Sequence, residues 1–562
     1  MTNQPLIECV PNFSEGRDLN IIRQITDAIA AVEGVTLLDV DPGKATNRTV
    51  VTFVGHPKAV IEGAFQGIKK ASELIDMSQH KGEHPRMGAT DVCPLIPIAN
   101  ITMEETVAYA KMLGERVGQE LDIPIYLYEA AATTPERKNL ATIRSGEYEA
   151  LSEKLTKPEW KPDFGQAKFN LKSGATVIGA RDFLIAYNVN INSKSVKLAN
   201  AIAFDVREQG RIKREGDPVT GKIVKDKEGN SVRIPGTCKS VKAIGWYIEE
   251  YGLAQISMNL TNIEDTSLHK AFEECSISAH NRGMRVTGSE LVGMVPIKVL
   301  LDAGKYFFAK QNRSTGVSRE ELIDMAIKSL GLNELSPFDP QKKIIEFAVK
   351  SHNAPLVKMN LREFANETAS ESPAPGGGSI AAYMGSLGAS LGTMVANLSA
   401  TKREWEANWP SFIKWAEQGQ ALKDQLLDLV DEDTNAFNKV MDAFKLPKEN
   451  PAEIETRKAA IEEANKYAMQ VPFKTMEISF QTFPLIEEMI KNGNPNSITD
   501  VGVAALSARS AVYGAYLNVK INASGIKDKA FVEAYMSKAD ALLEKTLKKE
   551  AELLALVGEK LL

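Results

Sequence analysis

The 562-residue chain is poor in cysteine and histidine and has no excess of positive charge. Its four cysteines, Cys9, Cys93, Cys238 and Cys275, lack Cys-x-x-Cys spacing, which excludes a disulfide framework and a zinc knuckle and favours a reducing compartment. With 67 basic and 73 acidic residues the net charge is −6, so the surplus that would neutralise a nucleic-acid backbone is missing. The first residues show no basic segment followed by an apolar run. We therefore expect a cytoplasmic protein that has no secretory signal and binds no nucleic acid.

One long segment, residues 372–401, contains no charged residue. About 20 apolar residues suffice to cross a bilayer. This segment, however, is rich in serine and glycine and has few large aliphatic side chains, which disfavours insertion. Gly385, Gly388 and Gly392 allow a neighbouring backbone to approach closely. We expect an internal helix of a folded domain and no membrane association.

The first third of the chain alternates strand and helix patterns. Strands are expected at residues 6–10, 35–40, 49–54 and 92–98, with helices from residue 19 and over residues 57–75. Strand, helix, two strands, helix and strand is the order of the ferredoxin-like fold. A helix at residues 103–121 and a strand at residues 124–128 follow, and then a passage rich in proline and glycine at residues 157–179.

A second cycle of the same kind is predicted further along. Its strands are expected at residues 183–191, 241–249, 254–260 and 286–299, and its helices at residues 194–207 and 267–282. The intervening residues 210–239 are rich in charge, glycine and turn signals, which indicates a solvated hairpin, with a basic lip over an anionic ligand as the alternative. The first half is thus an α+β protein with two ferredoxin-like subdomains, residues 1–182 and 183–336.

Strand signals vanish after about residue 360. The long helical periodicities that follow predict a separate all-helical bundle domain over residues 360–562, and residues 337–359, punctuated by proline, form a linker. No histidine or cysteine follows His352. Chemistry in the helical domain must therefore rest on carboxylate, lysine, tyrosine, serine or backbone groups.

Two of the six histidines fall in one loop, His80-Lys-Gly-Glu-His-Pro-Arg86. The spacing matches the His-x-x-Glu-His pattern of a zinc-peptidase helix. Gly82 weakens such a helix and Pro85 pushes His84 out of it, so the loop does not favour a metal site. A general acid/base at His84, with Arg86 beside it to hold an anion, is one interpretation. A histidine tied to the backbone is the other.

Polar residues stand where the first two strands end. Asn12 and Ser14 follow the first strand, Asp41 follows the second, and Arg48 begins the next. Strand ends on one sheet edge commonly supply site residues, and Arg48 is a candidate reader of a carboxylate or hydroxyl group. From the residues alone, helix capping and turn formation are the favoured explanation of the Asn, Ser and Asp residues.

The helical domain has two candidate features. Gly376, Gly377 and Gly378 open the uncharged helix and offer consecutive backbone N–H groups at a positive helix end, suited to an anion or to a flexible N-cap. In the helix over residues 422–444, Asp433 fills the one gap in an apolar stripe, whereas Asp431 and Glu432 fall on other faces. A buried carboxylate acquires a raised pKa useful for proton transfer, or serves as a structural partner of a lysine or tyrosine.

These segments together resemble the bifunctional formimidoyltransferase-cyclodeaminase family. In the first half the resemblance rests on Val10-Pro-Asn-Phe-Ser-Glu-Gly16, Leu37-Leu-Asp-Val-Asp41, Thr46-Asn-Arg-Thr49, residues 80–94, Gly179-Ala-Arg181 and Gly245-Trp-Tyr247. In the second half it rests on Ala374-Pro-Gly-Gly-Gly-Ser379, Val430-Asp-Glu-Asp433 and Gly514-Ala-Tyr-Leu-Asn518. Residues 210–239 are longer than the family pattern.

The resemblance implies two linked reactions. N5 of tetrahydrofolate attacks the formimidoyl carbon of N-formimidoyl-L-glutamate and displaces glutamate. N10 then attacks the same carbon and ammonia leaves, which gives 5,10-methenyltetrahydrofolate. Tetrahydrofolate, polyglutamylated in the family, is a co-substrate, and no tightly bound cofactor or metal is implied. The implied assembly is a homo-oligomer, a ring of dimers, and the implied pathway is histidine degradation.

The resemblance also assigns roles to residues. It implies that His84 moves protons in the transfer, with Asp41 orienting it, and that Asp433 protonates the departing amino group near Gly376–Gly378. The family's folate-binding stretch corresponds to Gly165, Gln166, Ala167, Lys168, Phe169, Asn170, Leu171, Lys172, Ser173 and Gly174. Two alternatives remain for the helical half: a methenyltetrahydrofolate cyclohydrolase, or a scaffold for oligomerisation.

Overall fold

The computed structural model describes residues 5–43, 47–82, 85–216, 220–249, 251–350 and 355–561. The chain divides into two compact units. One comprises residues 2–299 and 330–349, and the other comprises residues 300–329 and 350–562. Residues 300–329, which we expected in the second α/β subdomain, thus pack with the helical unit.

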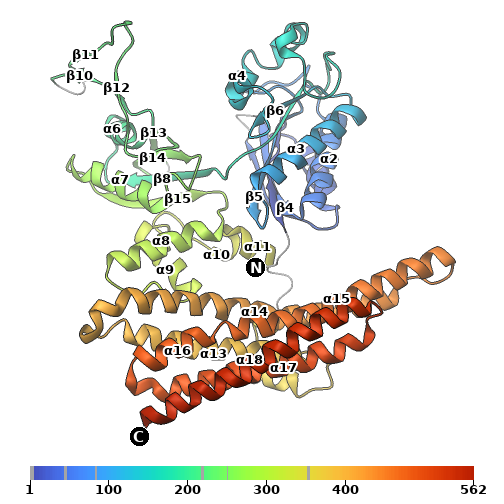
Figure 1. Ribbon diagram of the computed structural model, residues 1–562. Helices are drawn as coiled ribbons and strands as arrows, with labels where there is room; N and C mark the ends of the chain where they lie inside the picture. The colour runs from blue at the N-terminus through green and yellow to red at the C-terminus, as the bar shows by residue number, and fades with distance from the viewer. Residues whose placement is uncertain are drawn as a thin grey trace. The chain divides into compact units, whose positions relative to one another are not determined.

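The first α/β subdomain has the predicted ferredoxin-like core (Figure 1). Its elements are β1 (Leu6–Cys9), β2 (Asn12–Phe13), α1 (Leu19–Ala30), β3 (Val35–Gly43), β4 (Arg48–Gly55), α2 (Pro57–Leu74), β5 (Thr90–Ala99), α3 (Met103–Glu120), β6 (Ile125–Glu129) and β7 (Thr176–Ala180). Strands β3, β4, β1 and β5 pair antiparallel in that order, and β7 and β6 extend the sheet in parallel.

Successive side chains along these strands point to opposite faces of the sheet, and one of these faces packs against helices. Ile7, Phe53 and Leu95 are fully buried on that face with Ile29 and Ile68 of α1 and α2. Residues 130–175 contribute only short helices, among them α4 (Leu140–Arg144) and α5 (Leu151–Lys154). This region supplies one wall of the site described below.

The second α/β subdomain repeats the topology. Its elements are β8 (Ile185–Ile191), α6 (Val196–Val206), β13 (Val241–Ile248), β14 (Leu253–Leu260), α7 (Leu268–His280) and β15 (Val286–Val292), with strand order β13-β14-β8-β15. The expected strand at residues 286–299 is wrong at its end: Gly293 adopts a φ of +80°, which closes the strand, and α8 (Ile297–Lys310) begins soon afterwards.

The inserted residues 210–239 form two short antiparallel ladders, which confirms the predicted hairpin. The ladders are β9 (Arg211–Ile212) with β12 (Arg233–Ile234), and β10 (Arg214–Glu215) with β11 (Lys222–Ile223). Figure 1 shows this arm extending away from the sheet that carries it. After β15 the chain forms α8, α9 (Arg319–Leu330), α10 (Pro340–Lys343) and α11 (Ile345–Lys350).

The remaining chain is helical, as predicted. Its helices are α12 (Leu361–Thr368), α13 (Gly377–Ser399), α14 (Trp409–Lys445), α15 (Pro451–Phe480), α16 (Phe483–Asn492), α17 (Ile498–Asn522) and α18 (Lys529–Leu561). Helix α13 is long and apolar enough to span a membrane, yet most of it is buried among its neighbours. A Cβ on Gly388 would lie 3.0 Å from the carbonyl oxygen of Ala504 in α17, so glycine permits this close packing.

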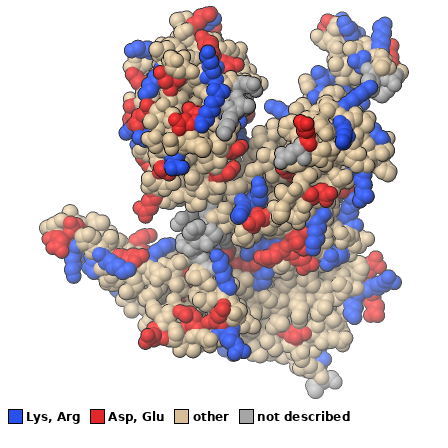
Figure 2. All heavy atoms as spheres, turned by 180° about the vertical axis from the view of Figure 1, so that it is seen from behind, with Lys and Arg blue, Asp and Glu red and all other residues tan. Residues whose placement is uncertain are grey.

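Charge on the surface is mixed. Figure 2 shows acidic and basic side chains interspersed over the face that it presents. This distribution agrees with the balanced composition of 67 basic and 73 acidic residues.

Candidate functional site

The first candidate site, called the loop site below, is built from residues 14–16, 47–48, 77–82, 85–91 and 144–149. His80 lies at its centre. Its Nδ1 accepts a hydrogen bond from Arg86 Nε at 3.2 Å, so its Nε2 carries the proton donated to the carbonyl of Asn47 at 2.9 Å. Both ring nitrogens of His80 are therefore occupied. His84, the predicted acid/base, lies outside the described residues, as do Glu83 and Thr46.

The turns after the first strands meet the histidine loop at the loop site. Asn47 is buried with a φ of +47°; its Oδ1 accepts from Gly16 N at 3.0 Å and its Nδ2 donates to the carbonyl of Lys81 at 2.9 Å. Ser14 Oγ donates to the carbonyl of Gly88 at 2.7 Å. These contacts join the turns after the first strands to the histidine loop. They identify Asn47, which the sequence analysis quoted only as part of the Thr46-Asn-Arg-Thr49 motif, as an organiser of the loop site.

The other predicted strand-end residues take different places. Asn12 donates to the carbonyl of Val10 at 3.0 Å, which is the turn-forming role. Asp41 is exposed on β3. Arg48 is partly buried at the start of β4, and burial lowers the pKa of its guanidinium.

A cavity of about 620 Å³ opens beside this loop. Its lining residues are Met77, Ser78, His80, Lys81, Gly82, Arg86, Gly146, Glu147, Tyr148 and Glu149. Arg86, which we interpreted as a residue that could hold an anion, lines this cavity. Its guanidinium forms ion pairs with Glu147 at 2.9 Å and Glu149 at 2.7 Å, so two carboxylates already compensate its charge.

The second half of the predicted folate stretch packs against Tyr148, which lines this cavity. The ring of Phe169 packs on Tyr148 with centroids 5.5 Å apart, and Tyr148 Oη donates to the carbonyl of Leu171. Asn170 caps the following turn by accepting from Ser173 N at 2.9 Å. Gly174 pairs with Gly88 in an isolated bridge, directly after the histidine loop. The remaining members, Gly165, Gln166, Ala167, Lys168 and Lys172, are exposed.

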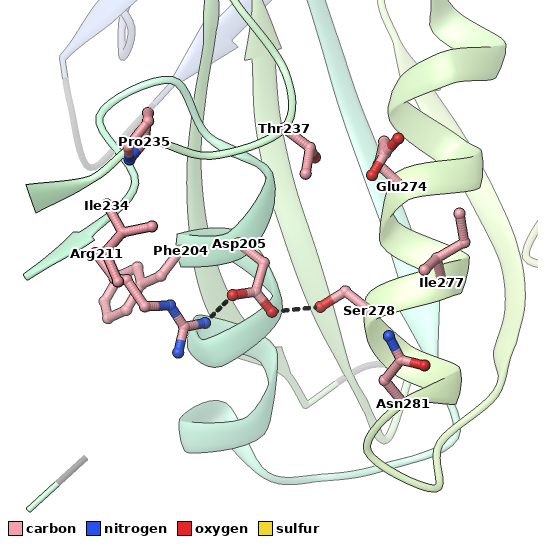
Figure 3. A pocket seen from close by; sticks show the side chains of 10 residues that line it. All are labelled: Phe204, Asp205, Arg211, Ile234, Pro235, Thr237, Glu274, Ile277, Ser278 and Asn281. Carbon is pink, nitrogen blue, oxygen red and sulfur yellow. Dashed lines mark hydrogen bonds and ion pairs between the residues drawn. The ribbon is translucent and has the colours of Figure 1, made fainter. Parts of the chain in front are cut away.

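A second cavity, of about 260 Å³, lies at the base of the inserted arm (Figure 3). Asp205 is its central charge. Its carboxylate accepts from Ser278 Oγ at 2.8 Å and forms ion pairs with Arg211 and Arg282. Arg211 of the arm is thereby engaged within the subdomain. The cavity thus provides no evidence for the basic lip that was the alternative for residues 210–239.

The second candidate site, called the helix site below, is where α14 meets the start of α13. The carboxylate of Asp433 lies against Gly378, where any Cβ would collide with it. It accepts hydrogen bonds from the backbone N–H of Ser379 and from Ser379 Oγ, the latter at 3.2 Å. Asp433 thus caps the helix whose own N-cap, Gly376, has no side chain to do so.

Burial raises the pKa of Asp433 above its ordinary value, and the hydrogen bonds from Ser379 oppose this shift. The glycine-rich helix start is therefore not an empty anion site. The anion that it receives is the carboxylate of Asp433 itself. A proton donor and acceptor with a raised pKa is thereby fixed at the surface of the bundle.

The apolar stripe of α14 in which Asp433 fills a gap is only partly buried. This corrects our interpretation that the whole stripe faces a core. Leu426 and Val430 are buried, but Phe437 and Phe444 are 41% and 49% exposed, because the paired ends of α14 and α15 project beyond the other helices (Figure 1). The more buried neighbour is Asp431, which we had placed on another face. Its carboxylate accepts the backbone N–H groups of Leu356 at 2.8 Å and Val357 at 3.2 Å.

Two further polar groups lie near the helix site. Asn518 of α17 faces the start of α13, since a Cβ on Gly377 would lie 3.2 Å from its amide nitrogen. Tyr467 of α15 donates to Glu432, and Lys439 lies 3.9 Å from the centre of the Tyr467 ring. Among the described residues no group of three or more His, Cys, Asp or Glu side chains is arranged to hold a metal ion.

Both halves of the chain match known protein families. The formiminotransferase domain, N-terminal subdomain, matches residues 6–181, the formiminotransferase domain matches residues 186–350, and formiminotransferase-cyclodeaminase matches residues 360–541. Formimidoyltransferase-cyclodeaminase of Mus musculus is 44% identical over 541 residues, which is 96% of each chain. The chain belongs to the formimidoyltransferase-cyclodeaminase family. The predicted resemblance and the predicted fold class are both confirmed.

Single-function relatives match each half of this family member separately. Glutamate formimidoyltransferase of Thermoplasma acidophilum is 42% identical over 323 residues, covering 57% of this chain and 98% of its own. Methenyltetrahydrofolate cyclohydrolase of Methylorubrum extorquens is 37% identical over 183 residues, covering 33% of this chain and 88% of its own. The loop site falls in the first half and the helix site in the second.

Proposed function

We propose that the chain is an enzyme with two consecutive activities in one-carbon folate metabolism. It transfers the formimidoyl group of N-formimidoyl-L-glutamate to N5 of tetrahydrofolate and then cyclises 5-formimidoyltetrahydrofolate to 5,10-methenyltetrahydrofolate. The observation that carries the proposal is the pairing of two separate sites, one in each half of the chain, with a family match that spans 96% of its length.

The first reaction belongs to the loop site. N5 attacks the formimidoyl carbon to form a tetrahedral centre, from which the bond to the glutamate nitrogen breaks. His84 accepts the proton of N5 and delivers one to the leaving nitrogen. His80 is unsuited to this task because Arg86 and Asn47 occupy its two ring nitrogens. The wall formed by residues 169–174 and Tyr148 is where we place folate.

The second reaction belongs to the helix site. N10 attacks the same carbon, and the amino group leaves as ammonia after receiving a proton. Asp433 supplies that proton. Burial raises its pKa, so the protonated form is more available at neutral pH than for an exposed aspartate. Ser379 holds the carboxylate in one orientation through its backbone and hydroxyl groups.

Tetrahydrofolate is a co-substrate in this proposal, polyglutamylated in the cell, and no other cofactor is bound tightly. We further propose a cytoplasmic enzyme of histidine degradation that forms a homo-oligomer, a ring of dimers. Helices α13 and α17 support the assembly, because they present a stripe of exposed apolar side chains. Its members are Leu387, Met394, Leu398, Val503, Leu506, Tyr513, Leu517 and Ile521.

One second candidate has its own support. The helical half is 37% identical to a methenyltetrahydrofolate cyclohydrolase, whose name implies hydrolysis of the methenyl product instead of its formation with ammonia release. A purely scaffolding role for the helical half is the remaining alternative. It does not account for a carboxylate held against a glycine-rich helix start.

One experiment separates these possibilities. The purified chain is mixed with N-formimidoyl-L-glutamate and tetrahydrofolate, and methenyl-folate absorbance and ammonia are followed together. We expect both to appear in equal amounts. Glutamate release without ammonia would leave the transferase and assign the helical half to hydrolysis or scaffolding.

A further inference from the structure

Arg86 is the fixed point of the cavity at the loop site. Its side chain is 9% exposed, and all five of its N–H groups donate hydrogen bonds. Nε donates to His80 Nδ1 at 3.2 Å, and one Nη donates to the carbonyl of His80 at 3.4 Å. The remaining bonds go to the carboxylates of Glu147 and Glu149. Arg86 therefore has no N–H group left for a ligand, and its role is to hold its neighbours.

The two carboxylates bound to Arg86 are engaged to different extents. Both oxygens of Glu149 accept from Arg86, Oε1 at 2.7 Å and Oε2 at 2.9 Å. Glu147 accepts with Oε2, at 2.9 Å, and within the part of the chain that the structure describes its Oε1 has no hydrogen bond. Glu147 lines the cavity, and its side chain is 40% exposed. It thus offers one acceptor oxygen to the cavity, while Arg86 holds the other oxygen of the same carboxylate.

The backbone of Glu147 has a conformation that residues with a side chain rarely adopt. Its φ of +56° and ψ of −156° belong to a region that is nearly restricted to glycine. Two backbone hydrogen bonds hold this turn: Glu147 N donates to the carbonyl of Arg144 at 2.7 Å, and Tyr148 N donates to that of Arg86 at 2.9 Å. Strain of this kind is concentrated at binding and catalytic sites. A glutamate at a position that favours glycine indicates a function for its side chain.

The charges around the cavity favour a cationic ligand group. Among the described residues, the ion-paired cluster of Arg86, Glu147 and Glu149 carries one net negative charge. The ring of His80 is neutral, because one nitrogen accepts a hydrogen bond and the other donates one. Lys81 also lines the cavity, but it is exposed, so that solvent screens its charge. The acceptor oxygen of Glu147 is therefore suited to a cation that donates hydrogen bonds.

We propose that Glu147 binds the formimidoyl group of the transferase donor and thereby selects an amidine over a formyl group. This inference rests on the transferase activity proposed above. An N-alkyl formamidine is a strong base and is protonated at neutral pH. Its two nitrogens share the positive charge in one plane, and their N–H groups match a carboxylate. A formyl group would instead place a carbonyl oxygen against the oxygen of Glu147, so that two acceptors would face each other.

The position of Glu147 also suits the reaction. Gly82 and Arg86 both line the cavity, and His84 lies between them in the sequence, so the loop that carries the acid/base borders the same space. Because Glu147 stabilises the protonated amidine, the formimidoyl carbon stays electrophilic until N5 attacks it. Arg86 is the residue that positions Glu147, and it does not touch the donor.

The test compares two donors in the full-length protein. Wild type and Glu147→Gln are assayed with N-formimidoyl-L-glutamate and with N-formyl-L-glutamate, and tetrahydrofolate is the acceptor. Wild type should prefer the formimidoyl donor. We expect Glu147→Gln to lower kcat/KM for that donor by about 100-fold. The ratio of the two kcat/KM values should fall at least as much, because the new amide can donate to the formyl oxygen. The KM for tetrahydrofolate should not change.

Two other variants separate donor binding from folding. Glu149→Gln is the matched control, because Glu149 binds the same arginine but both of its oxygens are already engaged. It should lower the unfolding temperature and keep the donor ratio. If Glu147→Gln fails to fold by circular dichroism, Glu147→Gly decides the question by the same ratio, since glycine adopts a φ of +56° without strain.

The outcomes are distinguishable. An unchanged donor ratio in folded Glu147→Gln would overturn the role of Glu147 and leave the transferase standing. A higher KM for tetrahydrofolate with both donors, at an unchanged ratio, would also overturn it and would assign the carboxylate to folate. An equal loss of the ratio in Glu149→Gln would overturn it as well, because the effect would then belong to the whole ion-paired cluster. Wild-type protein that transfers from neither donor would instead refute the proposed function.

Discussion

The loop site and the helix site are built from opposite kinds of backbone. At the loop site, turns distant in sequence are held together by side chains that bond to backbone groups, such as Asn47 to Gly16 and Lys81. At the helix site, the participating residues lie on three long helices, and Asp433 is placed by the packing of α14 against α13. Many polar anchors therefore position the first site, whereas one close helix contact positions the second.

This difference leads to different sensitivities. A loop site loses its shape when a side chain that anchors it, such as His80, is removed. A helix site changes little until a substitution alters the contact between the helices themselves. Predictions that separate anchors from reacting groups test this distinction directly.

The largest expected effect is at Asp433. Asp433→Asn should reduce ammonia release from 5-formimidoyltetrahydrofolate by about 10²–10⁴-fold, because the proton donor is lost, while formimidoyl transfer continues. Asp431→Asn is the matched control: it should lower stability by about 1–3 kcal/mol, through loss of the bonds to Leu356 and Val357, and leave ammonia release intact. Normal deamination by Asp433→Asn would show that another group carries the step.

The corresponding experiment at the loop site compares the two histidines. His84→Ala should reduce transfer by about 10²–10⁴-fold and leave deamination of supplied 5-formimidoyltetrahydrofolate unchanged. His80→Gln should mainly lower the unfolding temperature, because it removes a structural anchor. If His84→Ala abolished both activities in a protein with a normal circular dichroism spectrum, the assignment of one reaction to each half would be wrong.

A smaller effect is expected from the helix contact itself. Gly378→Ala should lower ammonia release by about 10–100-fold, since the new Cβ displaces the carboxylate of Asp433. Gly558→Ala in α18 is the control, because a Cβ there meets nothing within 4 Å. It should leave both activities unchanged. Equal ammonia release by the two variants would mean that the position of the Asp433 carboxylate does not limit the reaction.

The last prediction concerns stability and its dependence on pH, and it involves neither site. Burial raises the pKa of Glu8 on β1 from 4.5 to about 7, with Arg181 opposing. Protonated Glu8 therefore stabilises the fold fully below pH 4.5, and this contribution is lost as pH rises through 7. Between pH 4.5 and pH 8, the free energy of unfolding of Glu8→Gln should rise by up to about 3 kcal/mol relative to that of wild type, since each pKa unit corresponds to about 1.4 kcal/mol. Urea unfolding at both pH values measures this difference between the two proteins. If their free energies of unfolding changed with pH in parallel, the prediction would be contradicted.

Much of the fold followed from local pattern. Both ferredoxin-like cycles were predicted because their strands and helices alternate in short segments with clear periods, as in β1 to β5. The predicted end of β15 was wrong because the apolar residues after Val292 have no strand period of their own. Gly293 and the start of α8 interrupt that run. The grouping of residues 300–329 with the helical unit depends on contacts distant in sequence, which periodicity does not report.

The candidate residues were predicted with unequal success. Asp433 and Gly376 to Gly378 were singled out separately, and the structure brings them together. Asn47 stood in the Thr46-Asn-Arg-Thr49 motif, but its own role was not predicted, because it is an ordinary polar residue in that segment. Its importance arises only when the turn before β4 comes close enough to Gly16 and Lys81 for the Asn47 side chain to form hydrogen bonds.

The sequence by itself determined the order of elements, the change from α/β to helical architecture, and the scarcity of groups able to do chemistry. Those properties depend on residue type and spacing along the chain. Only the tertiary structure decided that Asp433 caps α13, that Arg86 is neutralised by Glu147 and Glu149, and that His80 is an anchor. The state of a charged or titratable side chain depends on the groups within a few ångströms of it, and for these residues folding brings those groups from distant parts of the chain.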